Sequence, residues 1–290
     1  MALTVLSLLT FLCFPAIVSA DALLGSRKPT REELRLHRNI ENRMSFAVVR
    51  PDAACEDTLL NIPYSRSGSL SRSHQVYFPE LYFVNAGLLR NGDIWLSRSN
   101  IEMASRLIAR YGFVPARYPS DTVAPASLPM LSHMVRDWYI ASGDKHYLRS
   151  MLPVLEKEYD YLMRDCSSPE GLNYHKSGDM GDSAIAGVEY NSVMYGMERN
   201  MAFFMRELAI QGDKLWEKRA ADRQKLMRGL MVDPVTKKYH DYDCSSAHRM
   251  DKPAGACGWA ALWSDVTDRG EGAVQASEPL DSLSAMQLFF

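Results

Sequence analysis

The sequence lacks a strong charge of either sign, and it lacks the short motifs of several enzyme classes. Its 290 residues carry 33 lysines and arginines against 35 aspartates and glutamates, which leaves a net charge of −2. So small a charge gives no general attraction to nucleic acids or anionic membranes. There is no G-x-S-x-G, H-E-x-x-H, phosphate-binding loop or dinucleotide fingerprint, so α/β-hydrolase chemistry, zinc proteolysis and phosphoryl transfer have no support. The 47% hydrophobic content is that of a globular protein.

Charged residues are absent from the first twenty positions. This stretch is mostly apolar from Leu3 to Val18 and ends in small side chains. The pattern predicts a secretory signal peptide over residues 1–20, and therefore a secreted protein. A transmembrane anchor is the alternative, which Pro15 and the short length disfavour, because a span needs about 20 apolar residues. No later segment is apolar enough to cross a membrane.

Cysteine is scarce, at five residues. Removal of the signal peptide leaves Cys55, Cys166, Cys244 and Cys257. An even number in an oxidising compartment allows two disulfides with three possible pairings, and Cys244 and Cys257 are the nearest pair in sequence. A zinc site formed by Cys244, His248 and Cys257 is the alternative, but no C-x-x-C motif accompanies it. N-glycosylation is not expected, because no N-x-S/T sequon exists.

Residues 21–75 and residues 76–290 differ in character. The first range is charge-rich up to about residue 45 and then carries Pro63 and a Ser/Arg/Gly run, which is typical of an N-terminal arm and a loop. The second range has apolar residues at helical spacing. The stripes are Ile101-Ala104-Leu107-Ile108-Tyr111, Leu131-Met134-Val135-Trp138-Tyr139, Leu148-Met151-Leu152-Leu155-Tyr159-Leu162, Val193-Met194-Met197-Met201-Phe204-Met205-Leu208 and Leu215-Ala220-Leu226-Leu230. The clear strand candidate is residues 238–244, which alternate in character.

A Gly-Asp pair recurs between the predicted helices, at Gly92-Asp93, Gly143-Asp144 and Gly212-Asp213. In each pair the glycine can end one helix in a left-handed cap, and the aspartate can cap the start of the next. We therefore expect successive helical hairpins that turn at Gly-Asp. Such hairpins must bury one face against their neighbours, so the array closes into a toroid or continues as a solenoid.

The densest polar segment is Tyr174-His-Lys-Ser-Gly-Asp-Met-Gly-Asp-Ser183. Its carboxylates, Asp179 and Asp182, lie among glycines, which let a backbone approach a ligand closely. A carboxyl on such a loop can act as a general acid if burial raises its pKa. The alternatives are a turn that caps the following helix and a calcium loop, for which the EF-hand spacing is absent. Glu189 begins the next helix, where a carboxylate interacts favourably with the helix dipole.

Five stretches follow one another in a family-like order: Arg72-Ser-His-Gln-Val-Tyr-Phe-Pro-Glu-Leu-Tyr-Phe83, Ile108-Ala-Arg-Tyr-Gly-Phe-Val-Pro115, Pro129-Met-Leu-Ser-His-Met-Val135, Val188-Glu-Tyr-Asn-Ser-Val-Met-Tyr-Gly-Met-Glu198 and Tyr239-His-Asp-Tyr-Asp243. Together they resemble segments of the trehalases, among them the R-F-x-E-x-Y-x-W-D-x-Y-F segment and the V-D-L-N-S-L-M-x-x-M-E helix. The resemblance implies an all-α fold: an (α/α)6 toroid of helical hairpins, incomplete here, with a short β-hairpin near residues 238–244. It also implies that residues 76–290 form a partial catalytic domain.

The resemblance further implies hydrolysis of α,α-trehalose to glucose with inversion, in which one carboxylic acid protonates the glycosidic oxygen and a base activates water. It places the acid at Asp182, with Asp179 as second choice, and Arg72, Tyr77 and Glu80 around the sugar. It implies no metal and no organic cofactor, and the small net charge implies no nucleic-acid partner. Two tryptophans could stack on sugar, although core packing is expected for both: Trp259 and Trp263.

Several family positions differ in this sequence. The Trp-Asp of the family is Pro79-Glu80 here, its Asn-Gly is Ala116-Arg117, and its sugar-binding Arg-Ser-Gln is Pro125-Ala126-Ser127. The family's catalytic base is a Glu near the C-terminus of a longer chain, so no base is assigned and a truncated chain is expected. Two alternatives therefore stay open. One is a catalytically inactive trehalase-like protein that binds carbohydrate or a partner, and the other is a related (α/α)6 glycosidase with another substrate.

Overall fold

Helical hairpins form most of the structure. The computed structural model describes residues 30–32, 35, 48–51, 59–65, 75–120, 123–175 and 184–268. The main helices of this part are α4 (Phe78–Arg90), α5 (Ile94–Tyr111), α6 (Leu131–Ser142), α7 (Lys145–Asp165), α8 (Val188–Glu207), α9 (Asp213–Leu230) and α10 (Trp259–Trp263), the last preceded by the 3-10 turn η1 (Gly255–Gly258). The predicted all-α fold class is confirmed. The predicted signal peptide, residues 1–20, lies outside the described residues.

The three Gly-Asp pairs lie at the turns between paired helices, as predicted. Gly92 lies between α4 and α5, Gly143 between α6 and α7, and Gly212 between α8 and α9, with φ angles of 81°, 68° and 124°. A side chain would be strained at such positive angles, so glycine allows each short reversal. Asp144 caps its helix by accepting a hydrogen bond from the Tyr147 backbone N–H at 3.0 Å. The aspartates of the other two turns make no such bond.

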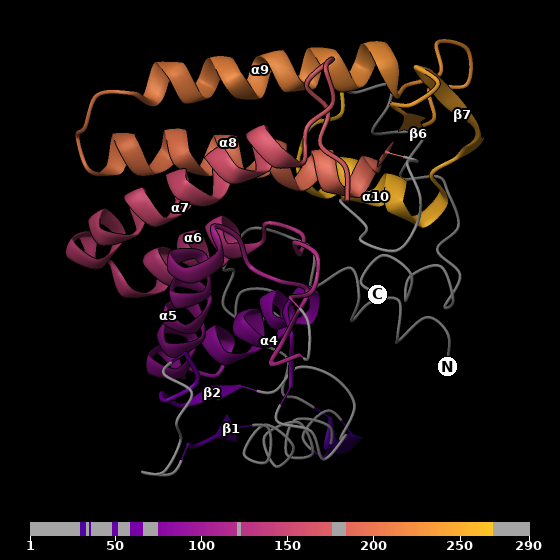
Figure 1. Cartoon of the computed structure of the whole chain (residues 1–290). Helices are drawn as coiled ribbons and strands as arrows, with labels where there is room; N and C mark the ends of the chain where they lie inside the picture. The colour runs from indigo at the N-terminus through magenta and orange to yellow at the C-terminus, as the bar shows by residue number, and fades with distance from the viewer. Residues whose placement is uncertain are drawn as a thin grey trace.

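The helices pack as an inner and an outer row. The inner helices α4, α6, α8 and α10 contact one another in that order, while α5 and α7 pack across them and α9 packs on α8. Figure 1 shows α8 and α9 side by side and antiparallel, with α10, β6 and β7 at the end where α8 begins. Two rows joined by hairpins are the arrangement expected of an (α/α)6 toroid.

Short strands join the long connections between the hairpins. The strands pair antiparallel as β1 (Val48–Val49) with β2 (Tyr64–Ser65), β3 (Val76–Tyr77) with β4 (Arg117–Tyr118), and β6 (His240–Asp243) with both β5 (Ile185–Ala186) and β7 (His248–Pro253). The hairpin predicted near residues 238–244 is therefore confirmed as β6 and its partner β7. Among the described helices, none combines the length and apolar character that a bilayer span requires.

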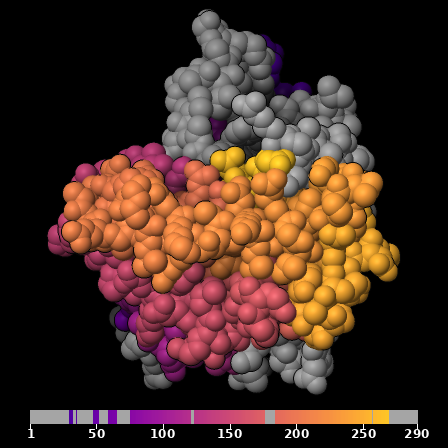
Figure 2. All heavy atoms as spheres, turned by 90° about the horizontal axis from the view of Figure 1, so that it is seen from above, coloured from indigo at the N-terminus to yellow at the C-terminus, as the bar shows by residue number. Residues whose placement is uncertain are grey.

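The buried face of α9 agrees with the predicted one at Ala220, Leu226 and Leu230, which are buried or packed against the core, but not at Leu215. Leu215, expected to mark this face, is 54% exposed, whereas Trp216 and Arg223 are buried. The reason is ionic, because Arg223 Nε donates to Glu198 Oε1 of α8 at 2.9 Å and both side chains are almost fully buried. The spacing of apolar residues does not predict that an arginine is buried. The opposite face of α9 forms part of the surface seen in Figure 2.

The four inner helices meet at the ring of His133 on α6. Its ring centroid lies 5.0 Å from that of Trp263 on α10 and 6.3 Å from that of Tyr82 on α4. A Cβ added to Gly196 of α8 would lie 2.4 Å from His133 Nε2. Burial, with a smaller contribution from the charge of Arg136, lowers the pKa of His133 to about 3, so the ring is neutral. Trp263 is partly buried and packs against this core, as expected.

Gly196→Ala should destabilise the protein, because the new methyl group would meet a histidine ring that its neighbours hold in place. Overpacking of this kind costs roughly 1–3 kcal/mol. Gly87→Ala in α4 is the matched control, since a Cβ there meets no atom within 4 Å. The control should gain about 0.5–1 kcal/mol from helix propensity. Urea unfolding measures both, and equal effects of the two substitutions would contradict the close approach of α8 to His133.

A carboxyl group is buried between α7 and the connection that follows α5. Glu158 is 2% exposed, accepts a hydrogen bond from the Val114 backbone, and its Oε2 has no partner among the described residues. Burial raises the pKa of Glu158 to about 8, so this group stays protonated at neutral pH.

The raised pKa of Glu158 predicts a pH dependence of stability. Unfolding lets this carboxyl ionise near its ordinary value, so the folded state holds a proton that the unfolded state releases. Stability should therefore fall as pH rises from about 4.5 to about 8. Glu158→Gln removes this titration. Its melting temperature relative to wild type should increase progressively from pH 5 to pH 9, and a constant difference across that range would show that Glu158 ionises normally.

Candidate functional site

The long connections of the fold gather at one end of the inner helices. The Gly-Asp turns lie at the C-terminal ends of α4, α6 and α8, whereas residues 112–130, 166–187 and 231–258 precede the N-terminal ends of α6, α8 and α10. Functional residues concentrate on long connections held by a rigid scaffold. We therefore place the candidate site at the N-terminal ends of these helices.

One cluster lies at the start of α4. The pairing of β3 with β4 sets Tyr77 opposite Arg117, and Glu80 follows in the first turn of the helix. Burial raises the pKa of Tyr77, the nearby Glu80 carboxylate raises it further, and Arg117 opposes both. Burial alone raises the pKa of Glu80. Tyr77 and Glu80, both predicted from sequence, are thus together, and the structure adds Arg117 beside them.

A second cluster lies at the start of α8. It brings together His175, Glu189 on the first turn, Asp241 of β6 and Cys257 of η1. Asp241 Oδ1 accepts a hydrogen bond from the Val188 backbone N–H at 2.9 Å, so a strand residue satisfies the start of the helix. His175 Nε2 lies 3.9 Å from Glu189 Oε1.

Glu189 is the most perturbed carboxyl of this second cluster. Burial, followed by the charge of Asp241, raises the pKa of Glu189 to about 7, against hydrogen bonds from its own backbone N–H and from Cys257. The carboxylate folds back over the helix start, since a Cβ at Gly187 would lie 2.5 Å from Glu189 Oε1. Glycine at 187 therefore leaves the space that this carboxyl occupies. A carboxyl that titrates near neutral pH can both give and take a proton.

The connection after α5 links the two clusters. His175 donates to the Ala126 backbone, and Ala126 pairs with Pro115. Ala116 directly follows Pro115, and its carbonyl oxygen accepts a hydrogen bond from the Phe78 backbone N–H at 2.9 Å. The two clusters therefore share one end of the helix array through a continuous series of backbone contacts.

Three predicted site residues lie outside the described residues: Arg72, Asp179 and Asp182. The described residues on either side of the acidic segment are His175 and Ala184. His175 belongs to the second cluster. Ala184 O accepts a hydrogen bond from the Cys244 backbone N–H at 2.9 Å, directly after β6, the strand that carries Asp241. Both sides of the predicted acidic loop therefore adjoin the second cluster.

Sequence reasoning missed three of the residues that gather here: Arg117, Asp241 and Cys257. Asp241 lies within the Tyr-Asp hairpin that carried part of the resemblance. The sequence therefore located this residue but did not indicate its contact with the start of α8. Arg117 was noted as a departure from the family pattern. The contact of Cys257 with Glu189 depends on the path of residues 231–258 and had no signal in the sequence.

The cysteine count allowed two disulfides without deciding their pairing; Cys55 lies outside the described residues, and the other three cysteines are not disulfide-bonded. Cys166, Cys244 and Cys257 are thiols, so the pair nearest in sequence is not bonded. The surroundings give the reason, because Cys257 hydrogen-bonds to Glu189 whereas Cys244 Sγ lies 3.9 Å from the Tyr242 carbonyl oxygen. The described residues also contain no group of three or more side chains that could hold a metal ion.

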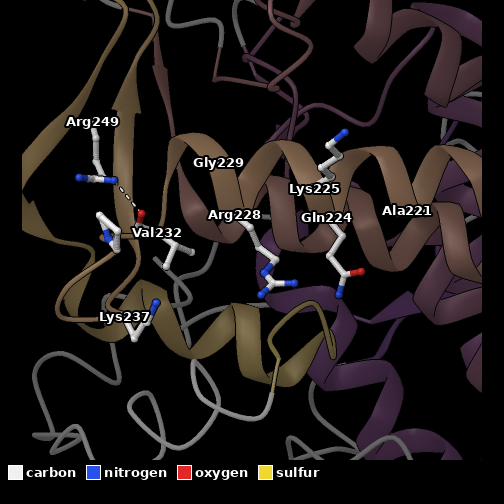
Figure 3. A pocket seen from close by; sticks show the side chains of 9 residues that line it. Ala221, Gln224, Lys225, Arg228, Gly229, Val232, Lys237 and Arg249 are labelled. Atoms are coloured by element: carbon white, nitrogen blue, oxygen red, sulfur yellow. Dashed lines mark hydrogen bonds between the residues drawn. The ribbon is translucent and has the colours of Figure 1, made fainter.

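A separate hollow lies on the outer side of α9. This cavity of about 570 Å³ is lined by residues of α9, of the connection that follows α9 and of β7, including four cations (Figure 3): Lys225, Arg228, Lys237 and Arg249. Arg228 pairs with Asp268, and Arg249 donates to the Val232 carbonyl oxygen at 2.7 Å. No carboxylate and no aromatic ring is among its lining residues, so it lacks the groups that protonate or stack on a sugar.

The family model and the curated relatives agree on one family. The family model described as Trehalase matches residues 54–183 and 167–289. A protein named probable trehalase from Oryza sativa subsp. japonica is 30% identical over 141 residues, which is 48% of this chain and 24% of the rice protein. A periplasmic trehalase from Xanthomonas oryzae pv. oryzae is 33% identical over 107 residues, which is 37% of this chain and 19% of that protein.

A solved structure agrees on the fold. The neutral trehalase from Saccharomyces cerevisiae superposes with a TM-score of 0.66 at 17% identity, covering 74% of this chain and 54% of the yeast chain. The present chain therefore spans about a quarter or less of the two relatives above and about half of the yeast structure. The fold of this chain therefore agrees with the predicted toroid of helical hairpins.

The second cluster makes a prediction about Cys257. Burial, with the charges of Glu189 and Asp241, raises the pKa of this thiol to about 12, so it should resist alkylation at pH 8. Glu189→Gln removes one of these charges and should speed iodoacetamide labelling of Cys257 by about tenfold, one pKa unit. Mass spectrometry reads each cysteine separately. Cys244 in the same protein is the control, and equal acceleration of both would indicate general loosening instead.

Proposed function

Because the chain belongs to the trehalase family, we propose that it is a trehalase-like glycoside hydrolase whose substrate is α,α-trehalose. The observation that carries the proposal is the family match over most of the chain. The convergence of polar residues at one end of the inner helices supports it, because a carboxyl, a tyrosine and an arginine are suited to hold sugar hydroxyls.

The proposed mechanism is inverting hydrolysis. Asp182, or Asp179 as second choice, donates a proton to the glycosidic oxygen as the bond from that oxygen to the anomeric carbon breaks. Water adds to the opposite face of the anomeric carbon and gives its proton to a base, so one trehalose and one water become two glucose molecules. Arg72, Tyr77 and Glu80 line the sugar. The base is not assigned to a residue of this chain.

Two further aspects of the proposal concern location and cofactors. The uncharged N-terminal stretch, together with the periplasmic name of the Xanthomonas relative, supports secretion. The mechanism uses carboxyl groups and water, so the proposal includes no metal and no organic cofactor.

A catalytically inactive, carbohydrate-binding protein is the second candidate. One specific observation favours it, because Pro125-Ala126-Ser127 replaces the family's Arg-Ser-Gln. In addition, the Ala126 backbone already accepts a hydrogen bond from His175. Binding of trehalose without release of glucose, measured by calorimetry on the purified chain, would favour this candidate.

The acid assignment predicts the effect of two substitutions. Asp182→Asn should reduce trehalose hydrolysis by roughly 10²–10⁴-fold, the usual contribution of a general acid, and Asp179→Asn should reduce it less. Asp160→Asn, on the exposed surface of α7, is the matched control and should leave turnover unchanged. Glucose release reports all three. Absence of turnover in wild type would defeat the enzyme proposal, and survival of turnover in both loop variants would defeat the acid assignment.

A further inference from the structure

The side chain of Asn191 joins the two stretches of chain that flank the acidic segment. On one side, Asn191 Nδ2 donates to the Asn173 carbonyl oxygen and Asn191 Oδ1 accepts from the Asn173 backbone N–H, both at 2.9 Å. On the other side, Asn191 Nδ2 donates to the Gly187 carbonyl oxygen at 2.9 Å. Asn191 is fully buried. One amide therefore connects residue 173 to residue 187, and Asp179 and Asp182 lie between them in sequence.

The hydrogen bonds define the orientation of this amide. Two N–H groups point at its oxygen, from the Asn173 backbone and from Arg223 Nη1 at 3.1 Å. Two carbonyl oxygens face its nitrogen, which has two hydrogens to donate. A flipped amide would place donors against donors and acceptors against acceptors, so one rotamer is strongly preferred.

Arg223, which donates to the Asn191 amide, is itself held by a buried ionic pair with Glu198. Arg223 Nε donates to Glu198 Oε1, which also accepts from the Tyr159 hydroxyl at 3.0 Å. Asn173 adds a link to α7, because its Nδ2 donates to the carbonyl oxygens of Leu162 at 2.9 Å and Cys166 at 3.1 Å. The series connects α7, α8 and α9 to both flanks of the acidic segment. Charged hydrogen bonds in a buried setting restrict geometry more than exposed ones do.

We propose that Asn191 is a positioning residue, which holds both flanks of residues 176–183 at the separation that places the catalytic acid. This inference rests on the proposed function, and it adds to that function a residue that touches no substrate. General acids must lie within hydrogen-bond reach of the leaving oxygen, so a small displacement of their support lowers the rate of proton transfer.

Asn191→Asp tests the role of the amide, because it keeps size and shape but replaces the double donor by an oxygen. The matched control is Asn100→Asp on α5. Asn100 is also fully buried, and its Nδ2 donates to Ser65 Oγ at 3.1 Å and to Asn85 Oδ1 at 2.9 Å, away from α8. Both substitutions thus remove two buried donor contacts, but only one touches the flanks of the acidic segment.

Two readouts separate positioning from general stability. Hydrogen exchange followed by mass spectrometry should show faster exchange, by about tenfold or more, in peptides covering residues 172–188 of Asn191→Asp but not of Asn100→Asp. Trehalose kcat should fall about 10²-fold with KM little changed, whereas hydrolysis of α-glucosyl fluoride should fall much less. Fluoride leaves with little help from an acid, so this substrate bypasses the step that depends on acid placement.

The outcomes are distinct. Equal exchange in the two variants overturns the proposal, and so does an equal loss of turnover for trehalose and for the fluoride. If wild type hydrolyses neither substrate, the proposed function fails and positioning for catalysis fails with it, while the exchange data still decide whether Asn191 holds the two flanks. If Asn191→Asp does not fold, Arg223→Lys serves instead, because it keeps a cation for Glu198 but removes the Nη1 donor to Asn191.

Discussion

The buried pair of Arg223 and Glu198 is the interaction on which the rest of this structure depends. It joins α8 to α9 with almost no exposure to water, and breaking such a pair from one side leaves an uncompensated buried charge. Its value here is geometric as much as energetic. Arg223 also binds Asn191, so the same contact that fixes the outer helix fixes the start of the inner one.

The two ends of the helix array have different physical demands. At one end glycines with positive φ let the chain reverse within a few residues, which leaves little room for functional groups. At the other end the long connections meet in short strands and bring carboxyls, a histidine, a thiol and an arginine together. Burial then raises the pKa of Glu189 to about 7. This division is the reason why we place the candidate site at the end with the long connections.

The sequence predicted the helices well because hairpins are local. Apolar spacing located α5 to α8, and Gly-Asp pairs located all three turns between the paired helices, since glycine conformation depends on few neighbours. The alternating segment near residue 240 gave the strand β6 for the same reason. Tyr77 and Glu80 were predicted as site residues from the resemblance to the trehalases, and they lie where α4 begins.

Local patterns by themselves therefore determined the helical hairpins and their turns, whereas the family resemblance supplied the toroid and one part of the candidate site. Tertiary structure alone decided that α9 buries Arg223, because the partner of this arginine lies on another helix. It also decided that Cys257 faces Glu189 rather than Cys244, and that Arg117, Asp241 and Asn191 join the site region. These contacts link residues far apart in sequence, and their energy depends on distance and burial, which composition and spacing do not contain.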